Sequence, residues 1–249
     1  MSQHTRPLNR QDYKTLTLAA LGGALEFYDF IIFVFFAAVV GELFFPADIP
    51  EWLRQVQTFG IFAAGYLARP LGGIIMAHFG DLVGRKKMFI VDIVAIGTFS
   101  ILSVFCADPL QLVAARFFIG VFVGADYPIA TSLIAEFTPK QHRSISMGMV
   151  SAAWYLGATV AAFVGYFLYS VPNGWQWMLG SAVIPCIILL IGRHDIPESP
   201  MWLAQKGRTE EADALMRRVF GEGVELELED PGEKTSLRKV FAGGYAKRI

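Results

Sequence analysis

Charge is scarce in this chain: charged residues make up 17% of its 249 residues, against about 25% in a typical soluble protein. The 21 Lys and Arg nearly balance the 22 Asp and Glu, so no excess of positive charge can follow phosphates, and a nucleic-acid-binding protein is excluded. Cysteine is also scarce. Cys106 and Cys186 alone cannot hold a disulfide scaffold together. Low charge combined with high hydrophobicity excludes intrinsic disorder.

Apolar residues are abundant instead. They form 54% of the chain, which includes 21 Phe, and the mean hydropathy is +0.47. They concentrate in six segments, at roughly 17–40, 57–79, 88–106, 109–135, 146–169 and 175–192. Each is long enough to cross a hydrocarbon core of about 30 Å as a helix. The sequence predicts an all-α membrane protein, and the first segment is too long and too late to be a cleavable signal peptide.

The basic residues alternate between the connections. The N-terminal stretch, the second and fourth connections and the tail are all rich in Lys and Arg, whereas the first, third and fifth connections hold Arg54 alone. Because cytoplasmic loops carry an excess of Lys and Arg, this pattern predicts that both chain ends are cytoplasmic. The protein is therefore predicted to be a multi-pass protein of the cell membrane.

Three regions follow from these patterns: a cytoplasmic N-terminus at 1–16, a six-helix transmembrane bundle at 17–192, and a cytoplasmic linker at 193–249. Charges interleaved with apolar residues predict a surface helix over 200–220, which Gly207 divides into two pieces. An acidic stretch follows, and a further short helix is predicted over 236–241.

Ionisable side chains stand inside several predicted spans, and such groups are costly in lipid, so they indicate function. We interpret them as lining a polar cavity in which carboxylates carry protons and Arg116 balances them or binds an anion. Structural pairing between helices is the alternative, and we favour it for Asp92 and Arg69. The candidates for the substrate and proton pathway are Glu26, Asp29, Arg116, Asp126, Tyr28, Trp154 and Tyr155.

Glycine repeats every fourth residue after Arg116, at Gly120 and Gly124. This spacing places them along one stripe of a helix, where a missing side chain permits close approach of another helix or of a substrate.

The loop between the second and third spans carries a motif. Asp81, Gly84, Arg85 and Lys86 resemble the signature loop of the major facilitator superfamily, which runs glycine, three residues, aspartate, a basic residue, any residue, glycine and basic residues. Ala77 and Leu82 depart from it, at the leading glycine and at the first basic position.

Further segments resemble the same superfamily. Residues 116–120 are similar to its fourth-span motif, which is linked there to proton coupling. Residues 135–143 and 197–203 are similar to runs in sugar porters and metabolite–proton symporters, and residues 23–30 resemble the first span of the latter. Residues 124–128 are similar to that branch and to phosphate–proton symporters.

The resemblance implies a twelve-helix fold of two six-helix halves, of which this chain is the N-terminal one, with a substrate site between them. It also implies a gating motif that holds one state closed, consisting of Asp81, Gly84, Arg85, Lys86, Glu136, Arg143 and Glu198. The missing half, or a second copy of the chain, would complete the cavity.

The predicted function is secondary active transport by alternating access, through proton-coupled symport of a small solute such as an organic anion, phosphate, sugar or related metabolite. The expected partners are this solute, protons and the lipid bilayer. A non-transporting membrane sensor or scaffold is the alternative. An enzyme is not expected, since the sequence contains no recognisable arrangement of catalytic residues. No cofactor or metal is expected either.

Overall fold

The computed structural model describes residues 10–138 and 140–220, and the regular structure in this part of the chain is helical, without strands. Within these described residues, six stretches are long and apolar enough to cross a membrane, which confirms the predicted all-α membrane fold. The helices are α1 (Arg10–Phe44), α2 (Glu51–Val83), α3 (Arg85–Val104), α4 (Pro109–Phe137), α5 (Arg143–Leu168), α6 (Gly174–Ser181), α7 (Val183–His194), α8 (Pro200–Gln205) and α9 (Thr209–Phe220), with a 3-10 turn at Lys140–His142.

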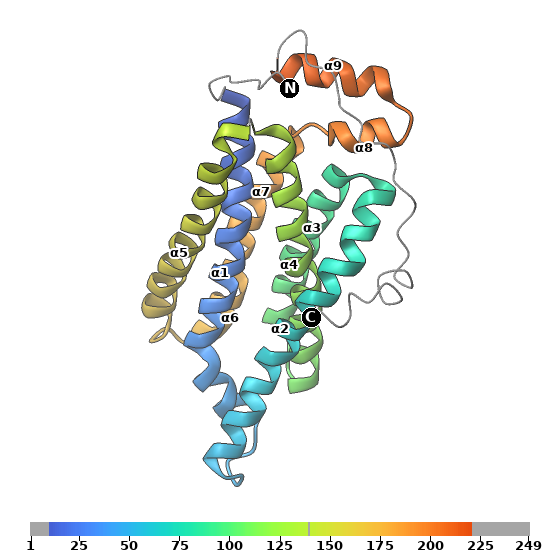
Figure 1. Cartoon of the computed structure of the whole chain (residues 1–249). Coiled ribbons are helices and arrows are strands. Elements are labelled where there is room, and N and C mark those ends of the chain that lie inside the picture. Colours follow the sequence, from blue (N-terminus) through green and yellow to red (C-terminus); the bar gives the residue numbers. More distant parts are fainter. Residues whose placement is uncertain (1–9, 139, 221–249) are drawn as a thin grey trace, which may run out of the picture.

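The long helices run side by side (Figure 1). Helix α1 packs mainly against α5 and α2 mainly against α4, while α3 packs against α4 and α7. The short helices α8 and α9 lie across one end of the bundle, and the α1–α2 connection lies at the opposite end (Figure 1). The core between the helices is apolar and includes Phe33, Phe36, Ile119 and Leu133, each almost fully buried.

Helices α2 and α4 cross in direct backbone contact. A Cβ built on Gly120 would lie 1.9 Å from the carbonyl oxygen of Gly65, and one on Gly124 would lie 2.1 Å from that of Arg69. The stripe predicted from the sequence therefore faces helix α2. Small residues are the usual means of such close packing between membrane helices.

The sixth span consists of two helices, with a break at Ala182 between α6 and α7. Pro185 follows in the first turn of α7 and has no backbone N–H with which to continue the hydrogen-bond ladder. Helix α7 ends at His194, two residues beyond the predicted limit of the bundle, and it carries Arg193 inside the protein.

The segment after the bundle folds as two short helices. Ser199 caps α8 by accepting a hydrogen bond from the Trp202 backbone N–H, and Pro200 occupies the first turn. Gly207, with φ of 75°, lies between α8 and α9, where the sequence placed a division. Trp202, Leu203 and Ala212 form a small core between these helices. The helix predicted over 236–241 lies outside the described residues.

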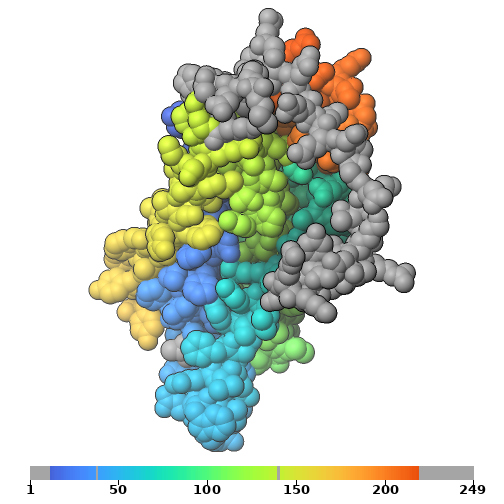
Figure 2. All heavy atoms as spheres, in the orientation of Figure 1, coloured from blue at the N-terminus to red at the C-terminus, as the bar shows by residue number. Residues whose placement is uncertain are grey.

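Helices α2 and α5 are the least buried of the six spans. Large apolar side chains protrude from both, including Leu67 and Ile74 on α2 and Tyr155 and Phe163 on α5. In Figure 2 both helices appear on one face of the molecule, α2 in cyan and α5 in yellow, with parts of α1 and α4 between them. These surfaces require an apolar environment or a partner.

Candidate functional site

Arg116 on α4 and Asp29 on α1 form a bidentate ion pair in the middle of the bundle. Arg116 Nη1 and Nη2 donate to Asp29 Oδ1 and Oδ2 over 2.7 and 2.9 Å. Each residue is only 4% exposed. The guanidinium also lies over the ring of Phe33, 5.1 Å from its centroid. Two parallel charge-assisted hydrogen bonds make this a strong and specific contact.

Glu26 pairs with a different helix. Its carboxylate accepts a hydrogen bond from Arg69 Nη1 over 2.6 Å, and both side chains stay partly exposed. The two residues line a cavity of about 440 Å³ between α1, α2, α4 and α5, together with Tyr127 and Trp154. Among the candidate pathway residues, this cavity joins Glu26 and Trp154.

Aromatic rings border this cavity. Trp154 stacks on Phe27, with centroids 5.1 Å apart, and lies 5.8 Å from the ring of Tyr127. Its buried indole N–H has no hydrogen-bond partner among the described residues. Tyr155, the next residue, is 71% exposed on the outer surface and does not line the cavity.

Tyr28 faces the other way around α1. Its hydroxyl shares a hydrogen bond of 2.5 Å with Ser181 on α6. Tyr28 lines a second cavity, of about 310 Å³, whose walls are almost wholly apolar and include Leu25, Val160 and Leu189. The structure therefore separates Tyr28 from Glu26 and Trp154.

Asp126 on α4 pairs with Arg193 on α7. Arg193 Nη1 and Nη2 donate to its two carboxylate oxygens over 2.5 and 3.2 Å, and Nη1 also donates to the Phe89 carbonyl over 3.0 Å. Arg193 is fully buried, and its guanidinium carbon lies 3.4 Å from the centroid of the Phe89 ring. This pair is separate from the larger cavity.

The α2–α3 loop contacts α4 and the start of α8. Gly84 has φ of 126°, which favours glycine, and a Cβ there would lie 2.5 Å from a Glu198 oxygen. Arg85 forms ion pairs with Asp81, at 3.6 Å, and with Glu136 on α4. The loop thus needs its glycine both for conformation and for space.

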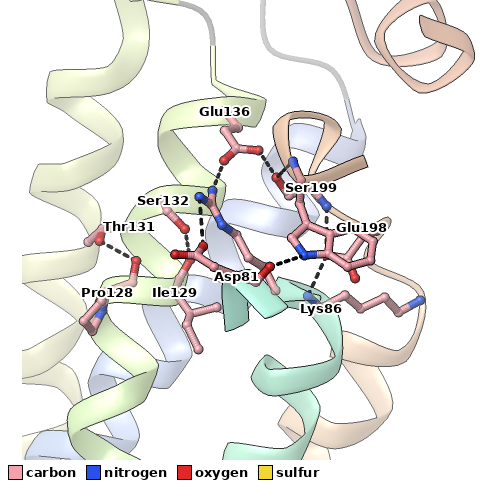
Figure 3. A network of polar contacts seen from close by, with 11 residues as sticks. Asp81, Lys86, Pro128, Ile129, Thr131, Ser132, Glu136, Glu198 and Ser199 are labelled. Atoms are coloured by element: carbon pink, nitrogen blue, oxygen red, sulfur yellow. Dashed lines mark hydrogen bonds and ion pairs between the residues drawn. The ribbon is translucent and has the colours of Figure 1, made fainter. Parts of the chain in front are cut away.

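Glu198 and Ser199 join this network from the start of α8. Glu198 accepts a hydrogen bond of 2.9 Å from the Lys86 backbone N–H, at the first turn of α3, where a negative charge is favourable. Ser199 donates to Glu136. Trp202 Nε1 donates to the Asp81 carbonyl over 2.9 Å. Figure 3 shows the side chains of Asp81, Glu136, Glu198 and Ser199 gathered in one network, with Glu136 at its top.

Arg143 stands apart from this group. Its Nε donates to the Thr138 carbonyl over 3.3 Å, which closes the turn between α4 and α5. In the described part of the chain no ion pair links it to the other gating candidates. The network therefore brings together six of the seven residues that the resemblance implies.

An exposed ion pair joins the beginning of α1 to the end of α7. Lys14 Nζ lies 2.9 Å from Asp195 Oδ2. The hydrogen bond from Lys14, followed by that from His194, lowers the pKa of Asp195 below its usual value. The pair is fully accessible to solvent on its carboxylate side, and it adds little rigidity.

Two arginines of these ion pairs were not among the candidate pathway residues. Arg69, for which structural pairing between helices was favoured, pairs with Glu26 on α1 and lines the cavity. Arg193 appeared to begin the cytoplasmic tail, yet it is buried against Asp126. The sequence feature that could have indicated both arginines is a carboxylate on another span, Glu26 for Arg69 and Asp126 for Arg193. A buried carboxylate needs a cationic partner. No cluster of three or more metal-ligating side chains occurs in the described ranges.

The fold and these contacts define a class, a six-helix membrane bundle of the kind that forms half of a major facilitator transporter. Residues 15–240 match the family described as sugar (and other) transporter, and the chain belongs to this family, within the major facilitator superfamily. The family is one of transporters and not of enzymes.

Two relatives from Escherichia coli K12 support this assignment. The chain is 46% identical over 193 residues to the putative metabolite transport protein YaaU, covering 77% of this chain and 43% of YaaU. It is 37% identical over 181 residues to the inner membrane metabolite transport protein YgcS, covering 72% of this chain and 40% of YgcS. The chain thus spans less than half the length of these relatives.

A solved structure has the same fold. The proton:xylose symporter XylE superposes with a TM-score of 0.79 at 22% sequence identity, over 84% of this chain and 50% of that chain. The match to half of XylE agrees with the prediction of one six-helix half.

Proposed function

We propose that this chain forms half of a proton-coupled symporter, in which the Arg116–Asp29 pair carries the coupling proton. The observation that supports the proposal is the burial of this pair with two hydrogen bonds. A proton on Asp29 would remove the charge that holds Arg116, so protonation and helix contact are linked. Ionisable groups inside a membrane protein commonly serve as proton relays.

The solute site we propose is the cavity between α1, α2, α4 and α5. It offers a cation and a carboxylate, from Arg69 and Glu26, a hydroxyl from Tyr127 and the indole ring of Trp154. Such a mixed lining suits a small polar metabolite with hydroxyl or carboxylate groups, and the aromatic rings suit its apolar carbon skeleton. Asp126, Tyr28 and Tyr155 would act outside direct solute contact.

Alternating access requires a second half, and we propose that it covers α2 and α5. These spans are the least buried of the six, and both contribute lining residues to the solute cavity. The partner would be six further helices of the same protein or a second copy of the chain, since relatives such as YaaU are more than twice as long as the matched region.

The network around Arg85 and Glu136 would act as the gate. It joins the α2–α3 loop to α4 and α8 through charged and hydrogen-bonded contacts between separate elements. The alternation of basic residues between the loops supports a cytoplasmic location for this end of the bundle and for both chain ends. The sensor or scaffold alternative has no support from the family match or the relatives.

The test is uptake into proteoliposomes of the full-length protein, with and without an imposed proton gradient. Asp29→Asn should abolish gradient-driven uptake of a solute identified by screening, while solute exchange without a gradient continues. Asp48→Asn, an exposed carboxylate in the α1–α2 connection, is the matched control. Gradient-driven uptake by Asp29→Asn at the wild-type rate would overturn the proposal.

A further inference from the structure

Asp92 on α3 is a buried carboxyl group without a hydrogen-bond partner among the described residues. Its exposed fraction is 0%, and neither carboxylate oxygen accepts a hydrogen bond from any described residue. An ionised carboxylate in this position would lose its hydration without compensation, which is among the costliest arrangements in a protein interior. Asp29 and Asp126, by contrast, each accept two hydrogen bonds from an arginine.

The charged groups that act on Asp92 come from two neighbouring helices, Asp126 from α4 and Arg193 from α7. Helix α6, which also packs on α3, has no ionisable side chain. The Arg193 guanidinium docks on the Phe89 carbonyl, one turn before Asp92 on the same helix. The thiol of Cys186 on α7 lies near α3 as well, 3.8 Å from a Cβ built on Gly97.

Arg193, the one arginine among the described residues that acts on Asp92, already binds Asp126. Both terminal nitrogens of Arg193 donate to Asp126, and Nε is buried without a partner among the described residues. Two ionised carboxylates beside one guanidinium would leave a net negative charge in a dry interior. Asp126 accepts two hydrogen bonds from Arg193, as a carboxylate does, whereas Asp92 accepts none from the described residues. The proton that restores neutrality therefore belongs on Asp92.

We infer that Asp92, Asp126 and Arg193 form a proton-binding site between α3, α4 and α7, with the proton on Asp92. It is separate from the Arg116–Asp29 pair, and it does not depend on whether that pair couples transport. Loss of the proton would place a second anion beside Arg193, whose Nε has no hydrogen-bond partner among the described residues. The site would make the contact of α7 with α3 and α4 dependent on pH.

Helix α1 closes the site at Gly22. A Cβ built there would lie 2.3 Å from Asp126 Oδ2 and 2.4 Å from Arg193 Nη2. The ion pair therefore occupies the space of the missing side chain. Gly22→Ala would move the pair without removing any of its charges, which provides a second, independent way to perturb the site.

Infrared difference spectroscopy on the full-length protein in lipid tests the inference. Aspartate labelled with ¹³C at its side-chain carboxyl should give the carbonyl stretch of a protonated acid at neutral pH, which shifts in D₂O and disappears on alkaline titration. Asp92→Asn should remove this band, whereas Asp29→Asn should retain it. A band that survives in Asp92→Asn, or no protonated aspartate band in the wild type at neutral pH, would overturn the inference.

If Asp92→Asn fails to fold, two glycine variants still test the proton-binding site. Gly22→Ala should change the pH at which the band disappears, because it moves the Asp126–Arg193 charges that act on Asp92. Gly148→Ala, at a position with open space around its Cβ, should titrate as the wild type does. An identical titration in Gly22→Ala and Gly148→Ala would place the protonated aspartate elsewhere and refute the site.

Discussion

Arg116 donates one hydrogen bond to each carboxylate oxygen of Asp29, and the two residues join α4 to α1 across the centre of the bundle. The residues are 87 positions apart in the chain. The contact therefore forms only when the bundle is folded, because neither helix contains both residues. Its burial gives the first of four predictions.

Arg116→Leu should destabilise the protein by about 3–5 kcal/mol, because it leaves a buried carboxylate without its partner. The double variant Asp29→Asn/Arg116→Leu should regain much of that loss, since no charge is then uncompensated. Denaturant unfolding in detergent measures both. A double variant less stable than Arg116→Leu would show that the pair is not coupled in this way.

Gly120→Ala should destabilise the α2–α4 crossing by about 1–3 kcal/mol, because its Cβ would meet the Gly65 carbonyl, a backbone atom that cannot rotate away. Gly60→Ala, on the same pair of helices but with nothing within 4 Å, should have no loss and a gain of about 0.5–1 kcal/mol from better helix propensity. Thermal unfolding compares the two. Equal effects would contradict the observed crossing.

Ser199→Ala should weaken α8 by about 1–2 kcal/mol, because the helix loses its N-cap and Glu136 loses a donor. Amide hydrogen exchange over α8 should rise, while exchange in the middle of α4 stays unchanged. Ser170→Ala, at an exposed serine in the turn that follows α5, is the control. Unaltered exchange over α8 would mean that Ser199 does not hold the helix.

The Lys14–Asp195 pair predicts a small dependence of stability on acid pH. Because the folded protein lowers the pKa of Asp195 from 3.8, its contribution is present above that pH and is lost as pH falls through the lower, folded value. The effect should be slight, since the carboxylate is fully exposed. Melting temperatures of wild type and Asp195→Asn should differ slightly above pH 4 and converge below it. A difference that grows on acidification would reverse the predicted sign.

Much of this arrangement was predictable from local patterns. Six apolar runs predicted the six spans because length and hydropathy alone decide whether a helix crosses a membrane. Gly84 and Asp81 marked the loop, and the spacing of Arg116, Gly120 and Gly124 predicted a face that another element approaches closely. Gly207 divided the following segment as predicted.

Pairing between helices was not predictable in the same way. Glu26 and Asp29 lie one turn apart on α1, but they contact arginines on different helices, α2 and α4. Arg69 was expected to pair structurally within the second span, with no partner named, and Arg193 was expected to begin the cytoplasmic linker. Their burial depends on which helices face each other, and no periodicity within a single span encodes that choice.

The sequence by itself determined the membrane class, the number of spans and the superfamily signature, because hydropathy, span length and motif spacing are local properties of the chain. The tertiary structure alone decided which charges neutralise one another. It assigned Arg116 to Asp29, Arg69 to Glu26 and Arg193 to Asp126, and it left Asp92 without a partner among the described residues. The physical reason is that a buried charge is stable only beside its counter-charge, and helix packing fixes where that counter-charge lies.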